Sequence, residues 1–501
     1  MTAAPADKTL RRLVLGVLLP GFSGTKAPEW LLEAAREGLA GVVLFAQNTP
    51  DIPTTRHLTD ELHDQGPLLV MIDEEGGDVS RMQAVHGSAL PGAAALGAVD
   101  DVALTRKAGG AIGGMLSAAG IDVDLAPVLD VSSEPTNPVI GVRSFGADSA
   151  QVADHGSAFI AGLHDVGIAA CAKHFPGHGA TKTDSHLELP LLDVSKELLL
   201  ERDVAPFAAV AHHSLDALMT GHLHIPAVGP KPGTLEPAVT RLARDLAGGR
   251  DRPIITDALD MAAVAGTDQE TFGEACVQAL EAGADLLCLG TTADRDDKAL
   301  FARALDAVTN AVEQGRITRE SLQQAHERTE HLRSRIQKYR NGEHSPSSEA
   351  AEENARSVGE EIARRAVRVE HGDVARSGPF ILVDLRRRVN HAAGRVSSAF
   401  ARALERKVGE ARVLTPGVPD SEPIAESLHN TDGYDIIALT REPLADESEQ
   451  HDLDAVLNAR PDTVVVHGGT EPAAPTANNV ILAHGVGRAN AEAVLNLILA
   501  D

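Results

Sequence analysis

Eight short apolar runs recur along the first 290 residues, and amphipathic helical patterns separate them. The runs cover residues 13–19, 41–45, 68–73, 121–128, 168–175, 216–222, 253–258 and 285–290. Stretches such as 28–39, 149–167 and 272–283 have the apolar spacing of helices. Continuous apolar strands that alternate with amphipathic helices are typical of a parallel sheet covered by helices. Eight such units predict an α/β protein built on a (β/α)8 TIM-like barrel.

A second pattern follows the barrel. A polar, helix-forming stretch after Gln314 leads to residues 341–354, whose Gly, Pro and Ser content is typical of a linker. Five further apolar runs, beginning with "FILVDL" and ending with "NVILAHG", then alternate with helical segments. We therefore expect a barrel with its linker helix over 1–340, a linker over 341–354 and a smaller α/β sandwich domain over 355–501.

The beginning of the chain imitates a secretory signal. Arg11 and Arg12 precede the apolar stretch "LVLGVLLPGF", but no small-residue cleavage site follows cleanly. The apolar run is only about ten residues long, and we interpret it as a buried strand. No other stretch approaches the roughly 20 continuous apolar residues that a membrane span needs.

Composition narrows the classes of partner. The chain has 501 residues, is 43% hydrophobic and carries a formal charge of -27 that is spread along its length. This charge argues against nucleic acid, whose phosphates require basic patches, and suits a neutral substrate. Cys171, Cys276 and Cys288 all lie in apolar segments and predict no disulfide framework, which fits either plain core packing or a reducing compartment, and we expect a cytoplasmic location. We expect no membrane partner, and a monomer is the working expectation.

Polar residues fall where the predicted strands end. Asp73 closes the third strand, Lys173 and His174 close the fifth, His222 closes the sixth, and Asp257 lies near the end of the seventh. Charged residues are also common wherever a loop begins, so one or two of them could be coincidental. Because active sites of this fold gather at the carboxyl ends of the strands, five together favour a site.

The stretch "KHFPGHGATKTDSHLELP" (173–190) is unusually rich in chemistry. His174 and His178 have the spacing of two metal ligands on a helix. Pro176 and Gly177 break that helix, however, and the motif lacks the glutamate of a zinc protease. The metal hypothesis is therefore weak, and we expect neither a metal nor another cofactor.

Asp184 and His186 in the same stretch form a better constellation. A turn at Ser185 can place the carboxylate against one imidazole nitrogen, which fixes the tautomer and raises the basicity of the other nitrogen. Such a pair is an acid/base unit. From the residues alone, the alternative that the two only fasten a loop stays open.

The motifs taken together resemble those of the family 3 glycoside hydrolases. "KHFPGHG" is followed by "DSH", and "IDEEGGDVSRM" (72–82), "GVRSFG" (141–146) and "IITDALDM" (254–261) accompany them in the family's order. Within that family the sequence is most similar to the β-N-acetylglucosaminidases. The resemblance covers the barrel, and the helical segment 360–369 with the α/β pattern after it resembles the family's second domain.

The resemblance implies a role for each matching residue. Asp257 would be the nucleophile of a retaining, exo-acting β-N-acetylglucosaminidase, His186 the acid/base that protonates the leaving oxygen, and Asp184 its dyad partner. The positions that match the sugar-binding subsite are Asp73, Arg81, Arg143, Lys173 and His174, with His222 and Met219 as weaker candidates that line the site or belong to the core. The partner would be a small molecule or oligosaccharide with a terminal N-acetylglucosamine.

Several of these residues also have structural interpretations. Asp257 could cap the following helix, and Asp73 could belong with Glu74 and Glu75 to a solvated acidic loop. The two arginines could pair with nearby acids. Asp124 and Asp130, which flank "LAPVL", are expected to hold loops rather than to touch substrate.

Two features depart from the resemblance or qualify it. Ala180 stands after "PGHG" where the family commonly has an acidic or amide residue, which removes a side chain that could brace the loop of Asp184 and His186. Aromatic residues make up only 3% of the chain, so platforms for stacking along a polysaccharide are scarce. A pocket for one terminal sugar fits this composition better than a cleft.

Other functions remain open at this level. Because a histidine is neutral after donating its proton, it would not repel phosphate, and a β-N-acetylglucosaminide phosphorylase is therefore the first alternative. A family 3 β-glucosidase is another, and a sugar-binding protein without turnover is a third. A scaffolding role for the C-terminal domain has no phosphate-binding glycine loop or basic patch to support it.

Overall fold

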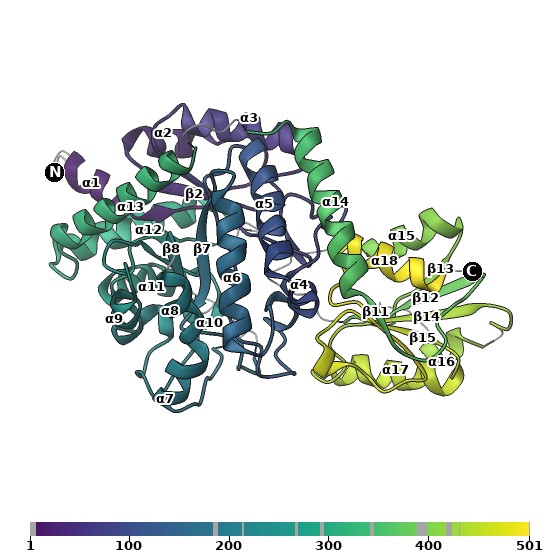
Figure 1. Ribbon diagram of the computed structural model, residues 1–501. Coiled ribbons are helices and arrows are strands. Elements are labelled where there is room, and N and C mark those ends of the chain that lie inside the picture. Colours follow the sequence, from purple (N-terminus) through teal and green to yellow (C-terminus); the bar gives the residue numbers. More distant parts are fainter. Residues whose placement is uncertain are drawn as a thin grey trace.

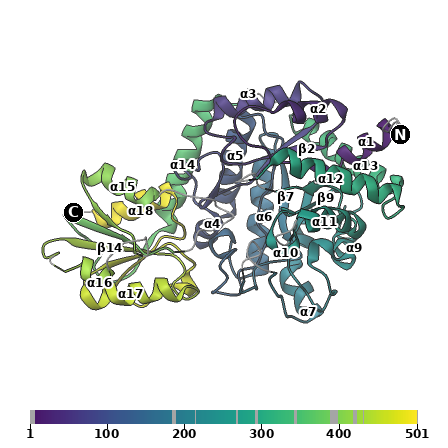
Figure 2. The same cartoon turned by 180° about the vertical axis from the view of Figure 1, so that it is seen from behind.

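The computed structural model describes residues 7–183, 189–212, 215–265, 269–290, 295–340, 345–387, 398–416, 423–429 and 431–499. The chain forms a larger and a smaller unit, and the long helix α14 (Ser348–Ala366) runs between them (Figure 1). Seen from behind, the sheet of the smaller unit lies between α15 and α18 on one side and α16 and α17 on the other (Figure 2).

The larger unit is a closed parallel barrel. Six strands form one sheet in the order β2-β3-β6-β7-β8-β9, and β1 pairs with β10. Val43 N donates to Pro20 O (3.1 Å), and Ile255 bridges Leu286, so both ends of the six-stranded sheet join the β1-β10 pair. The predicted TIM-like barrel is therefore confirmed. Its strands are β1 (Leu18–Leu19), β2 (Gly41–Leu44), β3 (Leu69–Ile72), β6 (Val123–Asp124), β7 (Ala169–Phe175), β8 (Ala217–Thr220), β9 (Ile254–Thr256) and β10 (Leu287–Cys288).

A helix follows each strand and covers the outside of the barrel. Asp51, Asp101, Asp148 and Asp296 each cap the start of one of these helices by accepting hydrogen bonds from its first backbone N–H groups. Among the described residues, no helix is long and apolar enough to span a membrane. The eight helices are α2 (Glu29–Glu37), α3 (Ile52–His63), α5 (Val102–Ala118), α6 (Ser149–His164), α8 (Ala205–Ala211), α9 (Pro237–Asp245), α11 (Gln269–Ala282) and α12 (Asp297–Glu313).

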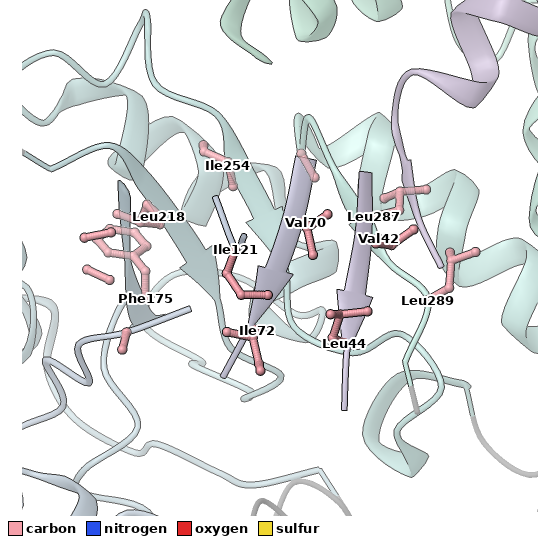
Figure 3. Close-up of a cluster of buried hydrophobic side chains, with 14 of the residues drawn as sticks. Val42, Leu44, Val70, Ile72, Ile121, Phe175, Leu218, Ile254, Leu287 and Leu289 are labelled. Atoms are coloured by element: carbon pink, nitrogen blue, oxygen red, sulfur yellow. The ribbon is translucent and has the colours of Figure 1, made fainter. Parts of the chain in front are cut away.

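Alternate residues of each strand face opposite sides of the barrel wall. Val42, Leu44, Val70 and Ile72 belong to the layer between strands and helices (Figure 3). Their neighbours in the sequence, which include Val43, belong to a separate cluster inside the barrel. Because side chains alternate along a strand, one continuous apolar run supplies both layers.

The first element differs from the prediction. Residues 13–15, expected to begin a strand, end helix α1 (Lys8–Leu15), and the strand β1 is limited to Leu18–Leu19. Asp7 caps the helix, and its buried residues Leu10, Val14 and Leu15 have helical spacing. The apolar run thus belongs to two elements that a turn at Gly16 separates.

Helix α13 (Arg319–Arg340) crosses the amino ends of the strands. Its Leu332 and Ile336 join the hydrophobic cluster inside the barrel. Three of its arginines pair with aspartates that lie one or two residues before a strand. Each of these aspartates also accepts a hydrogen bond from a backbone N–H of a neighbouring strand. The pairs are Arg340 with Asp122, Arg335 with Asp216 and Arg328 with Asp285.

The smaller unit is the predicted α/β sandwich. Its sheet has the order β11-β16-β15-β14-β12-β13, and only β11 runs antiparallel to its neighbour. One hydrophobic cluster packs α15 and α18 against one face, and a second packs α16 and α17 against the other. The elements are β11 (Arg368–His371), β12 (Phe380–Asp384), α15 (Ala399–Val408), β13 (Arg412–Leu414), α16 (Ile424–Ser427), β14 (Asp435–Thr440), α17 (Glu447–Ala459), β15 (Val464–His467), β16 (Asn479–Leu482) and α18 (Arg488–Ile498).

Helix α14 begins inside the range predicted as a linker. Ser347 caps it, and residues 348–354 are helical. The helix lies along α5 and carries apolar residues into the hydrophobic core of the barrel, among them Ala355 and Ile362. The turn-forming residues of the predicted linker therefore end at Ser347, and the residues after it have the apolar spacing of a buried helix face.

Candidate active site

The polar residues predicted at the strand ends lie on one rim of the barrel. Asp73 directly follows β3, and Asp257 directly follows β9. Lys173 and His174 are near the carboxyl end of β7, and His222 follows β8 by two residues. These strands are consecutive in the sheet apart from β6. The parallel order brings all their carboxyl ends to the same edge, as the sequence predicts.

Lys173 is the centre of a buried network of charges. Its Nζ lies 2.5 Å from Asp73 Oδ1 and 2.7 Å from Glu75 Oε1. The Lys173 side chain is only 2% exposed, whereas that of Asp73 is 18% exposed. Asp73 is therefore the member of this pair that a ligand above the rim can reach.

Two arginines complete the network. Arg143 forms a bidentate pair with Glu75, with Nε donating at 2.9 Å and Nη2 at 2.8 Å. Arg81 Nη2 lies 3.6 Å from Asp73 Oδ2. Bidentate pairing fixes the orientation of both planes, so Glu75 and Arg143 form a rigid base under the more accessible Asp73 and Arg81.

The network holds Glu75 and Lys173 in their charged forms. Burial alone would raise the pKa of Glu75, but Arg143 and Lys173 outweigh it and leave that pKa well below its usual range. Burial likewise opposes the charge on Lys173, yet Asp73 and Glu75 raise the pKa of its ammonium group. The rim thus offers both hydrogen-bond donors and acceptors without a large excess of either charge.

His174 is fixed in one tautomer. Its Nδ1 lies 2.7 Å from Asp130 Oδ2, and its Nε2 lies 3.3 Å from Arg143 Nη2. Because arginine only donates, His174 Nε2 accepts the hydrogen bond from Arg143. The Nδ1–H of His174 then donates a hydrogen bond to Asp130. His174 therefore links Asp130 to Arg143 and positions the guanidinium group.

Asp130 also holds the loop that follows. Its Oδ1 accepts from His178 N at 2.7 Å, while the His178 ring contacts Thr181 Oγ1 at 2.8 Å. Burial lowers the pKa of His178 to about 4, so this ring is neutral at physiological pH. His174 and His178 have separate side-chain partners at Nδ1, Asp130 for the first and Thr181 for the second.

Asp257 is partly exposed at the rim, and its backbone is held on both sides. Asp257 N donates to Thr220 O at 3.1 Å, and Asp257 Oδ1 accepts from Ala258 N at 2.7 Å. His222 Nε2 donates to Ala258 O at 2.9 Å. Since Thr234 Oγ1 lies 2.9 Å from its other ring nitrogen, buried His222 positions the loop of Asp257.

Two further predictions have other outcomes. Met219 is 3% exposed and belongs to the hydrophobic cluster inside the barrel, which is the core alternative for this residue. Asp184 and His186 lie outside the described residues. Before them, Asn137 Nδ2 donates to His178 O (2.9 Å), and after them Leu192 N donates to His224 O (2.9 Å), so both flanking segments are anchored to the barrel.

Sequence reasoning missed Glu75 as a site residue and gave Asp130 only a loop-holding role. A usable signal existed for both. Three cations among the candidates require buried acids as partners, and an acid that ends an apolar stretch, as Asp130 does, has to be paired when it is buried. Asp124 does hold a loop as predicted, because its Oδ1 accepts from Glu74 N at 3.0 Å.

The barrel matches the model of a known protein family, and almost the whole chain superposes on a solved structure. Residues 24–332 match the model of the glycosyl hydrolase family 3 N-terminal domain. The chain is 31% identical over 338 residues to beta-hexosaminidase A of Pseudoalteromonas piscicida, covering 62% of this chain and 56% of that protein. It is also 31% identical over 336 residues to a beta-hexosaminidase of Nitrosomonas eutropha, covering 64% of this chain and 95% of that one.

The structural match extends over both units. A family 3 beta-N-acetylglucosaminidase from Paenibacillus superposes with a TM-score of 0.86 at 29% identity, covering 99% of this chain and 97% of that chain. The order of the barrel and the smaller α/β unit is therefore shared with this neighbour. The chain spans about half the length of the Pseudoalteromonas relative, so its similarity there is confined to part of that protein.

Proposed function

Since the chain belongs to glycosyl hydrolase family 3, we propose that it is a retaining, exo-acting β-N-acetylglucosaminidase. The names of the relatives support the choice of sugar, because two of them are beta-hexosaminidases and the superposed structure is a beta-N-acetylglucosaminidase. The substrate is an oligosaccharide or conjugate that ends in N-acetylglucosamine.

One observation carries the proposal: a partly exposed carboxylate, Asp257, shares the barrel rim with a paired network of donors and acceptors. A neutral sugar needs both kinds of hydrogen-bonding group for its hydroxyls. Asp73 and Arg81 are the accessible members of the network, and Lys173, Glu75 and Arg143 lie behind them. These two accessible groups bind hydroxyls of the terminal sugar in this proposal.

The reaction proceeds in two displacements. The Asp257 carboxylate attacks the anomeric carbon while the bond to the leaving oxygen breaks, and His186, oriented by Asp184, gives that oxygen a proton. His186 then takes a proton from water as the water oxygen attacks the anomeric carbon and releases Asp257. Two inversions at the same carbon retain the configuration.

The exo mode follows from the scarcity of stacking platforms. Aromatic residues make up 3% of the chain, and the described rim network contains only charged side chains and histidine. Extended polysaccharide clefts rely on aromatic faces that stack on successive rings. A site that grips one ring through charged groups is suited to a chain end.

Labelling and a substrate panel test the function. We expect the protein to cleave an aryl N-acetyl-β-glucosaminide much faster than the matching glucoside or xyloside. A mechanism-based fluorosugar should label Asp257, and Asp257→Ala should lower turnover at least about 10³-fold. Release of free N-acetylglucosamine in phosphate buffer, rather than its 1-phosphate, separates hydrolysis from phosphorolysis.

Asp251 provides the matched control, since it is exposed and lies three residues before the same strand begins. Asp251→Ala should keep both labelling and turnover. Labelling of another carboxylate, or a preference for the glucoside, would overturn the proposal.

We also propose a cytoplasmic location and a role in recycling fragments of the cell wall. The three cysteines are free and buried, which is compatible with a reducing compartment. Cell fractionation tests the location. Faster release of N-acetylglucosamine from muropeptides than from chitooligosaccharides would support the role, and the reverse order would reject it.

A further inference from the structure

A short hairpin connects Asp73 to the rest of the barrel rim. It consists of β4 (Glu74–Gly76) and β5 (Val79–Ser80), joined by Gly77 and Asp78. Gly77 has a φ of +59°, and a Cβ there would lie 2.5 Å from Gly92 N. The hairpin therefore packs backbone against backbone, and its tip leaves the barrel toward the smaller unit.

Two residues of the smaller unit bind the tip of this hairpin through Asp78. Arg441 Nη1 lies 2.9 Å from Asp78 Oδ2, and Val486 N donates to Asp78 Oδ1 at 3.2 Å. The side chains of Asp78 and Arg441 are only 2% and 11% exposed. An ion pair excluded from solvent is much more sensitive to the loss of one partner than a surface pair.

The receiving groups lie where open parallel sheets usually bind ligands. Arg441 directly follows β14, and the Gly485–Gly487 turn follows β16 and leads into α18. Buried Asn490 fixes this turn by donating to Ala483 O at 2.7 Å. Ligands of open parallel sheets bind beyond the carboxyl ends of the strands, and helix N-termini favour anions; here the carboxylate of Asp78 occupies that position.

Glu75 is three residues from Asp78 on the same hairpin. It is the carboxylate that Lys173 and Arg143 share beneath the sugar-binding groups. A small cavity beside this network is lined by residues of both units, among them Glu75, Arg143, His484 and Gly485. Gly77 N donates to Leu90 O at 2.7 Å and holds the hairpin on the barrel side, while the contacts of Asp78 attach its tip to the smaller unit.

We propose that Arg441 is a positioning residue for sugar binding. By holding Asp78 it keeps the hairpin, and with it Glu75 and Asp73, in the geometry that receives the terminal sugar. The inference rests on the proposed function and extends it, because it makes the smaller unit part of the binding site through a contact that never touches substrate. Asp257 lies on another strand and does not depend on this contact.

Steady-state kinetics of Arg441→Met test the proposal. We expect KM for the aryl N-acetyl-β-glucosaminide to rise about tenfold while kcat changes less than about threefold. Arg441→Lys keeps the charge and should recover most of the loss. Asp78→Asn should raise KM about as much as Arg441→Met does. The double variant should raise KM little further, because each change removes the same Asp78–Arg441 pair.

Arg460→Met is the matched control. Arg460 bonds the backbone of Thr431 and Tyr434 within the smaller unit and pairs with Asp462, away from the barrel. We expect it to lower the melting temperature without raising KM. Equal KM for Arg441→Met and the wild type, or an equal rise in the control, would overturn the proposal.

Hydrogen exchange provides a readout that needs no turnover. Amides of residues 74–82 should exchange at least about tenfold faster in Arg441→Met than in the wild type. Their exchange rates should be unchanged in Arg460→Met. If the wild type does not cleave the substrate, the proposed function fails, while faster exchange still verifies the grip on the hairpin. Unchanged exchange in these residues would reject the positioning role itself.

Discussion

Two adjacent glutamates show how much a single position in this site decides. Glu75 lies between Arg143 and Lys173 and stays ionised, whereas Glu74 points into the protein, where its Oε2 accepts from Arg81 N (2.8 Å) and Met82 N (2.9 Å). Burial raises the pKa of Glu74 to about 7. One carboxyl therefore supplies permanent charge, and its neighbour titrates near physiological pH.

The raised pKa of Glu74 predicts a pH-dependent stability. The folded chain binds this proton more tightly than the unfolded chain, so the contribution is fully present below pH 4.5 and is lost as the pH rises to about 7. Glu74→Gln keeps an oxygen for both backbone donors and removes the charge. We expect urea unfolding to find the variant more stable than the wild type by on the order of 2–3 kcal/mol at pH 8, and much closer to it at pH 5.

Glu75→Gln provides the opposite control. Removing an ionised partner leaves Lys173 and Arg143 buried with less compensation, so this variant should be less stable than the wild type at pH 8. If Glu74→Gln has the same stability difference at both pH values, Glu74 is not the titrating group.

At the scale of elements, helix α13 joins the strands at the end opposite the site. Asp216 is fully buried there and accepts from Ala170 N (3.0 Å) and Tyr339 Oη (2.7 Å), while His164 Nε2 lies 2.6 Å and Arg335 Nη1 3.2 Å from it. A single carboxylate thus links two strands to two helices. The barrel separates this stabilising end from the end that carries the chemistry.

We expect Asp216→Ala to reduce the free energy of unfolding by about 3–5 kcal/mol, because it leaves several buried donors without an acceptor. Denaturant unfolding measures the loss, and KM of the folded fraction should stay unchanged. Asp165→Ala is the control, since Asp165 pairs with Arg106 on the surface and such pairs contribute at most about 1 kcal/mol. Equal losses in both variants would contradict the linking role of Asp216.

At the scale of the molecule, α14 belongs to the barrel as much as to the smaller unit. Its residues Ala355, Val358 and Ile362 lie in the barrel's hydrophobic core, and its Arg365 pairs with Asp101 at the start of α5. The helix also contacts α18 of the smaller unit. The two units therefore meet at α14 and at the Asp78 contact.

This arrangement predicts where the barrel can be cut. A fragment of residues 1–340 lacks α14 and exposes the apolar face of α5, whereas a fragment of residues 1–370 retains it. Burial of Val358 and Ile362 contributes about 1.5–3 kcal/mol each, so we expect the longer fragment to melt at a clearly higher temperature. Equal melting temperatures would place the barrel boundary at 340, as the composition of the chain predicts.

Much of the fold could be predicted because it depends on local patterns. Continuous apolar runs and amphipathic helical patterns specify the strands and helices of the barrel almost independently of one another. The exception, α1, arose where one apolar run serves a helix and a strand. Candidate residues such as Asp73, Lys173 and Asp257 could be placed on one rim because parallel strands bring all their carboxyl ends together.

What the sequence determined by itself was the fold class and the polar residues at the carboxyl ends of the strands, since both depend on spacing along the chain. Only the tertiary structure decided which acid pairs with which cation. Glu75 pairs with Arg143, which is 68 residues away along the chain, and Asp78 pairs with Arg441 of the smaller unit. Such partners depend on how elements pack in space, and neither residue type nor spacing carries that information.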